Sequence, residues 1–177
     1  MRFFLFQLRA FVNAGFSQIL VLTGHAGGNQ VDLRLVARCF EAQTNCSVVV
    51  RADPELVEGS FSGDHAGMYE ISQLLSIRPD LVKMERMHRV NGHLGRQAQG
   101  DDATKANARL GKEILELSLT KIGGLLSSDL GIATSHLSYE ETNQIWQEIV
   151  SKKEEWISIK PRDGQRKVSE SSRWANY

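Results

Sequence analysis

The stretch that decides the fold is ILVLTGHAGGN, residues 19–29. Its first part, Ile19-Leu-Val-Leu22, is a short continuous apolar run, which is typical of a strand buried on both faces of a parallel sheet. The part that follows, Thr23-Gly-His-Ala-Gly-Gly-Asn29, is too rich in glycine to continue a strand. The sequence therefore predicts a buried strand that opens into a glycine-rich loop carrying His25.

Helices and strands alternate around this stretch. Apolar residues at helical spacing predict a helix before the strand: Phe4, Leu8, Phe11 and Val12. Residues 31–42 predict a second helix, and Ser47-Val-Val-Val50 predicts a second buried strand. This alternation indicates an α/β fold, a three-layer sandwich with a mostly parallel central sheet.

The rest of the chain is predicted to be mainly helical. A helix starts near His65 with Asp64 as its cap and stops at Arg78-Pro79. Residues 105–126 and 138–156 predict two further helices, while residues 53–63 and 80–102 predict a loop and an extended connection. The core stripe expected for the helix at 105–126 is Ala108, Gly111, Ile114, Leu115 and Leu119. We expect one domain over residues 1–159, followed by a polar, weakly ordered tail at 160–177.

Composition excludes several classes of protein. Lys+Arg and Asp+Glu both number 21 in the 177 residues, and this balance argues against a nucleic-acid partner. Gln7 and Arg9 interrupt the apolar amino-terminal run, which is also too short to cross a bilayer, so we expect neither a signal peptide nor a membrane partner. The two cysteines, Cys39 and Cys46, lack zinc-binding spacing, and we expect a reducing, cytoplasmic location.

The histidine of the glycine-rich loop is the first candidate for chemistry. Ligands in open α/β sheets bind at the carboxyl ends of strands, which is where His25 is predicted to lie. Neutral imidazole is a common metal ligand, and flanking glycines allow close approach of the backbone to a ligand. A turn histidine that hydrogen-bonds the backbone is the alternative. A phosphate cradle would need a GxGxxG pattern or a following Lys-Ser/Thr, and neither is present.

A second candidate is DHAGMYE, residues 64–70, at the predicted start of a helix. His65 and Glu70 are suited to sharing metal ligation and proton transfer, with Asp64 beside them. Glu70 near a helix start is also what simple capping of the helix dipole would produce. Both interpretations remain open from the residues alone.

Three motifs in chain order resemble the creatininase (creatinine amidohydrolase) family. The first is Thr23-Gly-His-Ala-Gly-Gly-Asn29, similar to the family's glycine-rich histidine loop. The second is Gly63-Asp-His-Ala-Gly-Met-Tyr-Glu-Ile-Ser72, similar to the family signature His-Ala-Gly-x-x-Glu-Thr-Ser. The third comprises Gly100-Asp101, Ala103-Thr104 and the helix glycine Gly111. The resemblance runs from about Phe3 to Leu126.

The resemblance implies an amidohydrolase that cleaves the C–N bond of a small cyclic or linear amide with one or two divalent metals, zinc or manganese. His25 matches a metal ligand, and Glu70 matches the signature glutamate that binds the metal or works beside its water. His65 matches the histidine that contacts substrate and moves protons, with Asp64 as its acidic neighbour. Many family members are hexamers, so a homo-oligomer is expected.

The sequence departs from the family pattern at two points. Ile71 replaces the signature threonine, and no Glu-x-His occurs anywhere, although family metal sites draw on such an N-terminal segment with a following aspartate. The resemblance thus implies an N-terminally incomplete domain whose activity is impaired. His88, His93 and His136 are predicted to be surface residues. The alternatives are a non-catalytic protein of the same fold that binds a ligand or partner, and a nucleotide-binding α/β module that uses the His25 loop.

Overall fold

The computed structural model of the chain describes residues 1–24, 28–89, 100, 102–126 and 131–157. Its centre is a two-stranded parallel sheet of β1 (Gln18–Thr23) and β2 (Ser47–Ala52), paired from Gln18 opposite Ser47 to Thr23 opposite Ala52. The helix α2 (Asn29–Glu41) connects the two strands. The predicted strand, helix and strand are therefore confirmed as one crossover unit.

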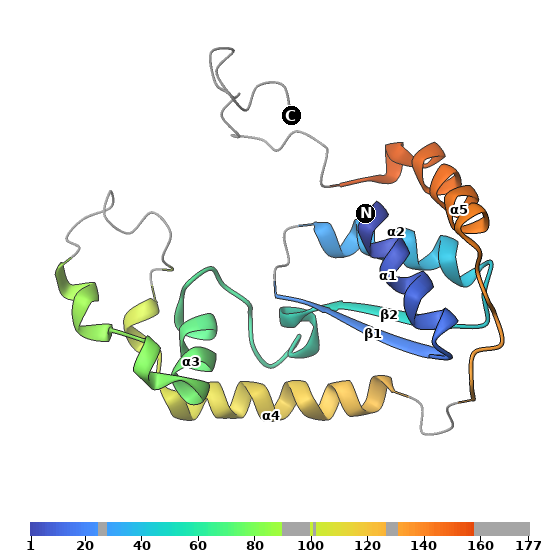
Figure 1. Cartoon of the computed structure of the whole chain (residues 1–177). Coiled ribbons are helices and arrows are strands. Elements are labelled where there is room, and N and C mark those ends of the chain that lie inside the picture. Colours follow the sequence, from blue (N-terminus) through green and yellow to red (C-terminus); the bar gives the residue numbers. More distant parts are fainter. Residues whose placement is uncertain (25–27, 90–99, 101, 127–130, 158–177) are drawn as a thin grey trace, which may run out of the picture.

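Helices cover both sides of this sheet (Figure 1). On one side, α1 (Arg2–Asn13), α2 and α5 (Tyr139–Ser151) pack together, and on the other side runs α4 (Ala108–Leu125). The main apolar core joins the first group to the strands, and its fully buried members include Leu5, Leu8, Val12, Val36, Phe40, Val50 and Ile149. This arrangement confirms the predicted α/β class.

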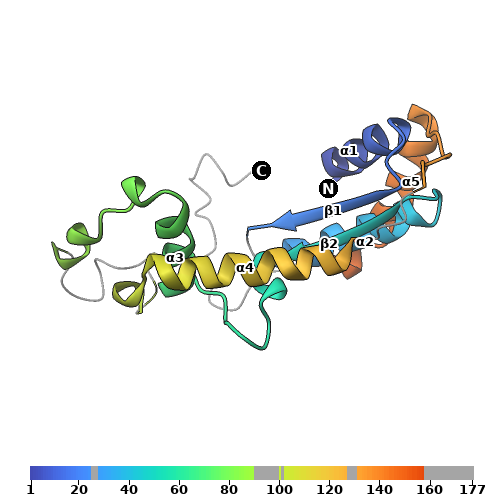
Figure 2. The same ribbon diagram turned by 90° about the horizontal axis from the view of Figure 1, so that it is seen from below.

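A second packing unit lies beyond the carboxyl ends of the strands. The arrowhead of β1 points toward the end of the molecule where α3 (Met68–Ile77) and α4 lie side by side (Figure 2). A separate apolar cluster joins them: Leu56, Val57, Tyr69 and Ile114. A Cβ at Gly111 would overlap the carbonyl oxygen of Ser72, so only glycine allows the two helix backbones to approach this closely.

Five short 3₁₀ helices are described, in the predicted loops at 53–63 and 80–102, next to them, and at the end of the predicted last helix. They are η1 (Asp53–Leu56), η2 (Pro79–Leu81), η3 (Met84–Arg89), η5 (Ala103–Lys105) and η6 (Lys153–Glu155). The predicted connection at 80–102 is therefore not simply extended where it is described. The predicted last helix ends at Ser151, and Trp156 packs against the main core from beyond η6.

The core stripe predicted for α4 is wrong in part. Ala108 is exposed and Leu119 is 67 % exposed, whereas Gly111, Ile114 and Ser118 are buried. The reason is the close approach of α3 at Gly111, which turns the face containing Gly111 and Ile114 inward and leaves Leu119 outside.

No helix among the described residues is both long and apolar enough to cross a membrane. The predicted boundary at residue 159 and the tail at 160–177 fall outside the described residues and remain predictions.

Candidate functional site

A pocket of about 380 Å³ lies at the carboxyl edge of the sheet, where both strands end. The end of β1, the start of η1 and the first turns of α3 all contribute to it, through Leu22, Thr23, Gly24, Asp53, Leu56, Glu70 and Gln73. Strand ends of an open parallel sheet are where such proteins bind ligands. The structure thus brings Glu70 to the same pocket as Gly24, the residue before His25. His25 itself lies outside the described residues, so its distance from Glu70 remains a prediction.

Glu70 is held by the turn that precedes α3. Its Oε2 accepts a hydrogen bond from the backbone N–H of Ala66 at 2.7 Å. Ala66 has a φ of 47°, a left-handed conformation that a non-glycine residue adopts only when its surroundings impose it. This bond fixes the half-buried Glu70 carboxylate at the wall of the pocket.

Asp64 caps α3. Its carboxylate accepts from the N–H of Tyr69 at 2.6 Å and from those of Gly67 and Glu70, each at 3.2 Å. These are N–H groups that the first turn of a helix cannot satisfy internally. The predicted capping is confirmed, although the helix begins at Met68 rather than near His65. A catalytic part for Asp64 remains a prediction.

The histidines are more exposed. His65 follows Asp64 in the turn, its side chain is exposed, and it does not line the pocket of Glu70. Its proposed proton transfer therefore remains a prediction. His136 is exposed, as predicted for a surface residue. His93 and the side chain of His88 lie outside the part of the chain that the structure describes.

Two residues that lie between the members of the third motif, Asp102 and Asn107, bond to the second motif. Asp102 Oδ1 accepts from the Met68 N–H at 3.0 Å, and the Ser72 hydroxyl accepts from the Asn107 N–H at 3.0 Å. A Cβ at Gly67 would overlap carboxylate oxygens of Asp64 and Asp102. Gly67 of the second motif and the neighbouring Asp102 therefore fix the start of α3, which positions Glu70.

Asp53 is a pocket residue that the sequence interpretation missed. It directly follows β2, and its Oδ2 accepts a hydrogen bond from Gln73 Nε2 at 3.3 Å. The Tyr69 hydroxyl is buried beside Asp53 and Gln73. Burial, and next the neighbouring Asp53, raise the pKa of Tyr69. The rule that ligands bind at strand ends could have identified Asp53, since it follows β2 as Gly24 follows β1.

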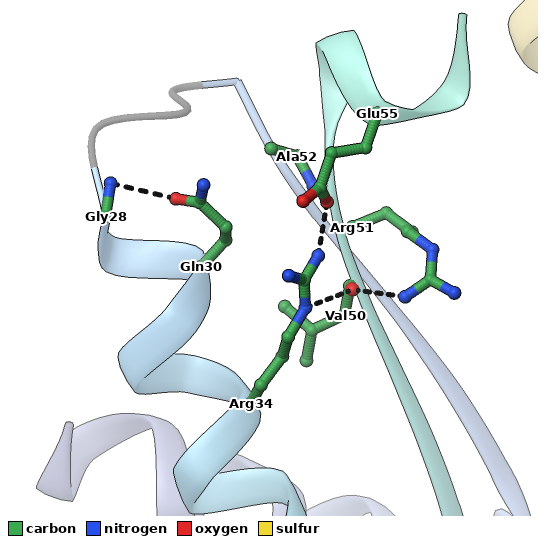
Figure 3. A network of polar contacts seen from close by, with 7 residues as sticks. All are labelled: Gly28, Gln30, Arg34, Val50, Arg51, Ala52 and Glu55. Carbon is green, nitrogen blue, oxygen red and sulfur yellow. Dashed lines mark hydrogen bonds and ion pairs between the residues drawn. The ribbon is translucent and has the colours of Figure 1, made fainter. Parts of the chain in front are cut away.

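An ion pair beside the pocket ties η1 to α2 and β2 (Figure 3). Arg34 pairs with Glu55, and its Nε donates to the carbonyl of Val50 at 3.2 Å. The Arg34 guanidinium is the main reason that the pKa of Glu55 is lowered. Since Glu55 lies two residues after Asp53, this pair also fixes the segment that carries Asp53.

The carboxylates that line the pocket are of a chemical type that binds divalent metals. Glu70 and Asp53 offer oxygen donors of the sort that zinc and manganese accept. Within the described ranges, however, no group of three or more His, Cys, Asp or Glu side chains could hold an ion. A complete site would need donors from elsewhere, and His25, which follows Gly24 in the sequence, is the predicted one.

Comparison with known proteins agrees with this geometry. The family model Creatininase, described as creatinine amidohydrolase, matches residues 6–126, which include β1, β2, α3 and the pocket between them. No curated protein sequence matches the chain.

Two solved structures share the fold. A creatininase with a tryptophan-to-phenylalanine substitution is 20% identical with a TM-score of 0.55, over 70% of this chain and 60% of that one. A creatininase with a glutamate-to-glutamine substitution, complexed with creatine, is 20% identical with a TM-score of 0.54, over 70% of this chain and 61% of that one. The chain thus spans about three fifths of the length of these structures. With the family model covering most of its residues, the chain belongs to the creatininase family.

Proposed function

We propose that the chain is a metal-dependent amidohydrolase that hydrolyses the C–N bond of a small cyclic or linear amide. The observation that carries this proposal is the shared pocket of Glu70 and Gly24 at the carboxyl edge of the sheet. This pocket lies within the region that the creatininase model matches, and the family suggests hydrolysis. The creatine bound to one creatininase structure supports a small-molecule ligand.

His25 and Glu70 would hold the ion, zinc or manganese. When bound, such an ion lowers the pKa of a water ligand and polarises an amide carbonyl. The hydrogen bond from the Ala66 N–H fixes the orientation of the Glu70 carboxylate. Metal ligation or proton transfer at the pocket wall requires such a fixed orientation. His65, exposed in the adjoining turn, would give a proton to the leaving nitrogen.

Asp64 has a supporting part in this proposal. Its oxygens are engaged by three N–H groups of the α3 start, so it holds the turn that carries both His65 and Glu70. We therefore expect replacement of Asp64 to lower activity through the position of this turn.

The number of ligands limits the expected activity. Catalytic zinc sites use three protein ligands, and His25 and Glu70 would supply two. The Asp53 carboxylate accepts a hydrogen bond from Gln73 and is not counted as a third. We propose that the 177-residue chain alone binds metal weakly and turns over slowly. A segment with Glu-x-His, joined to the chain or added as a peptide, should raise metal binding first and turnover second.

The test is amide hydrolysis with added zinc or manganese, together with elemental analysis, before and after that addition. Glu70→Gln should lower the rate about 100-fold or more, because the amide oxygen cannot act as a base and is a poorer ligand. His25→Ala should remove the metal. Glu116→Gln, at an exposed site on α4, is the matched control and should leave the rate unchanged.

Unchanged metal content in His25→Ala would contradict the ligand assignment. Binding of the amide without any turnover, even with the added segment and either metal, would instead support the non-catalytic alternative.

A further inference from the structure

The two strands of the sheet stay paired up to their carboxyl ends. The N–H of Ser47 donates to the carbonyl of Ser17, so with the observed parallel register the odd-numbered residues of β1 bond to β2. The last pair of this register is Thr23 opposite Ala52. Neighbouring strands lie about 5 Å apart, so the residues that follow the two strands start from adjacent positions.

Asp53 follows β2 at this point, as Gly24 follows β1, and both line the candidate pocket. The proposed function assigns the other pocket carboxylate, Glu70, to the metal ion and gives Asp53 no part. Within the described ranges, neither carboxylate forms an ion pair, and no lysine or arginine lines the pocket. A pocket lined by charges of one sign attracts ligands of the opposite sign.

Two side chains of α3 fix the position of the Asp53 carboxylate. Gln73 Nε2 donates to Oδ2 at 3.3 Å, and the buried hydroxyl of Tyr69 lies beside the same carboxylate. A carboxylate has about four acceptor positions, so Asp53 can still accept a hydrogen bond from a ligand in the pocket. Its charge is therefore held in a defined place next to the strand end that leads to His25.

The hydrogen bond from Gln73 also selects among cations. A guanidinium binds a carboxylate best as a planar fork that uses both oxygens, and Gln73 already engages Oδ2 of Asp53. An ammonium group is a compact charge that needs only one oxygen. The geometry at Asp53 therefore favours an ammonium group over a guanidinium group.

We propose that Asp53 binds the protonated amine of the substrate, so that the substrates of this pocket are short amino amides. In such a molecule a short aliphatic chain joins an ammonium group to the amide that is hydrolysed. The inference rests on the proposed function, which places the amide at the metal ion beside Glu70. Leu22 and Leu56, which also line the pocket of about 380 Å³, offer apolar contacts to the methylene groups.

The experiment measures the binding of small amides to the full chain by NMR titration at about pH 7, where an amine is mainly protonated. Glycinamide and β-alaninamide carry an ammonium group, and acetamide and propanamide are their counterparts without it. We expect one or both ammonium amides to bind about tenfold or more tightly than the neutral counterpart. Added salt should reduce this preference, and guanidinoacetamide should bind more weakly than glycinamide.

Variants test whether Asp53 is the source of the preference. Asp53→Asn removes the charge and keeps an acceptor for Gln73, and Asp53→Ser removes the charge with a smaller side chain. Each should abolish the preference for the ammonium amide. Glu58→Gln is the matched control, because it removes one negative charge from a nearby exposed residue that does not line the pocket, and it should keep the preference. Circular dichroism confirms that each variant is folded.

Four results would overturn the inference. They are equal binding of ammonium and neutral amides by the original chain, a preference that survives both Asp53 variants, an equal loss of preference in Glu58→Gln, and a loss of bound zinc or manganese in Asp53→Asn by elemental analysis. The last result would make Asp53 a metal ligand.

Turnover separates this inference from the proposed function. A chain that prefers ammonium amides through Asp53 but hydrolyses none of them, even with the added Glu-x-His segment, contradicts the proposed function alone. Hydrolysis of neutral and ammonium amides with equal efficiency contradicts the inference alone.

Discussion

The two edges of the central sheet differ although their strands are equally long and equally apolar at the centre. Side chains from α2 and η1, namely Arg34, Glu41 and Glu55, bond to the outer backbone groups of β2. The outer backbone groups of Leu20 and Leu22 in β1 face an uncharged groove instead. The difference shows that the exposure of a strand depends on what neighbouring elements place beside it, and not on the strand's own residues.

The difference between the two sheet edges also affects the candidate pocket. The pair of Arg34 and Glu55 that closes the β2 edge also holds η1, and Asp53 at the start of η1 lines the candidate pocket. At the β1 edge, no described side chain connects the groove with the pocket except Leu22, which lines both. The ion pair of Arg34 and Glu55 therefore both closes the β2 edge and helps to shape the pocket.

The largest effect on stability is expected from proline substitutions in β1, at residues whose N–H groups face opposite edges of the strand. Val21→Pro removes an N–H that the register assigns to the bond with β2, and we expect a loss of about 3 kcal/mol in the free energy of unfolding. Leu22→Pro removes an N–H of the outer edge and should cost far less. Urea denaturation measures both. Equal losses would show that the assignment of inner and outer edges is wrong.

A smaller effect is expected from breaking the closure of the β2 edge. Arg34→Ala removes a donor from Val50 and the partner of Glu55, and we expect a loss of about 2 kcal/mol. A double-mutant cycle with Glu55→Ala should give a coupling energy of about 1 kcal/mol. The cycle on Lys112 and Glu116, an exposed pair at 3.7 Å, is the control and should give a coupling near zero. Equal coupling in the two cycles would contradict the closure.

The smallest effect is the dependence of this closure on pH. The Arg34 guanidinium lowers the pKa of Glu55 below its value in the unfolded chain. The contribution of Glu55 is therefore fully present above the unfolded pKa of about 4.3 and is lost as the pH falls through the folded pKa. Glu55→Gln should flatten the fall in stability between about pH 5 and pH 3, measured by thermal or urea unfolding. A fall as steep as that of the original chain would exclude this role.

The sequence by itself determined the elements that depend on local patterns. The apolar run at 19–22 predicted β1, helical spacing predicted α1 and α2, and Asp64 before an apolar helix predicted its cap, because each signal lies within a few residues of the structure that it specifies. The family motifs also came from sequence, since their order along the chain matches that of the family even where identity is low.

Only the tertiary structure decided which residues meet. Asp53 joins Glu70 in one pocket because Gln73 of α3 bonds to Asp53 at the start of η1, and no spacing along the chain encodes that contact. The buried face of α4 differs from its predicted stripe because Gly111 lets Ser72 of α3 approach its backbone. The edges of β1 and β2 differ because α2 and η1 present charged side chains to β2, whereas α1 presents Phe4 and Phe11 beside β1. Local sequence sets the conformation of each segment, and packing sets the neighbours of each side chain, since those neighbours come from segments distant along the chain.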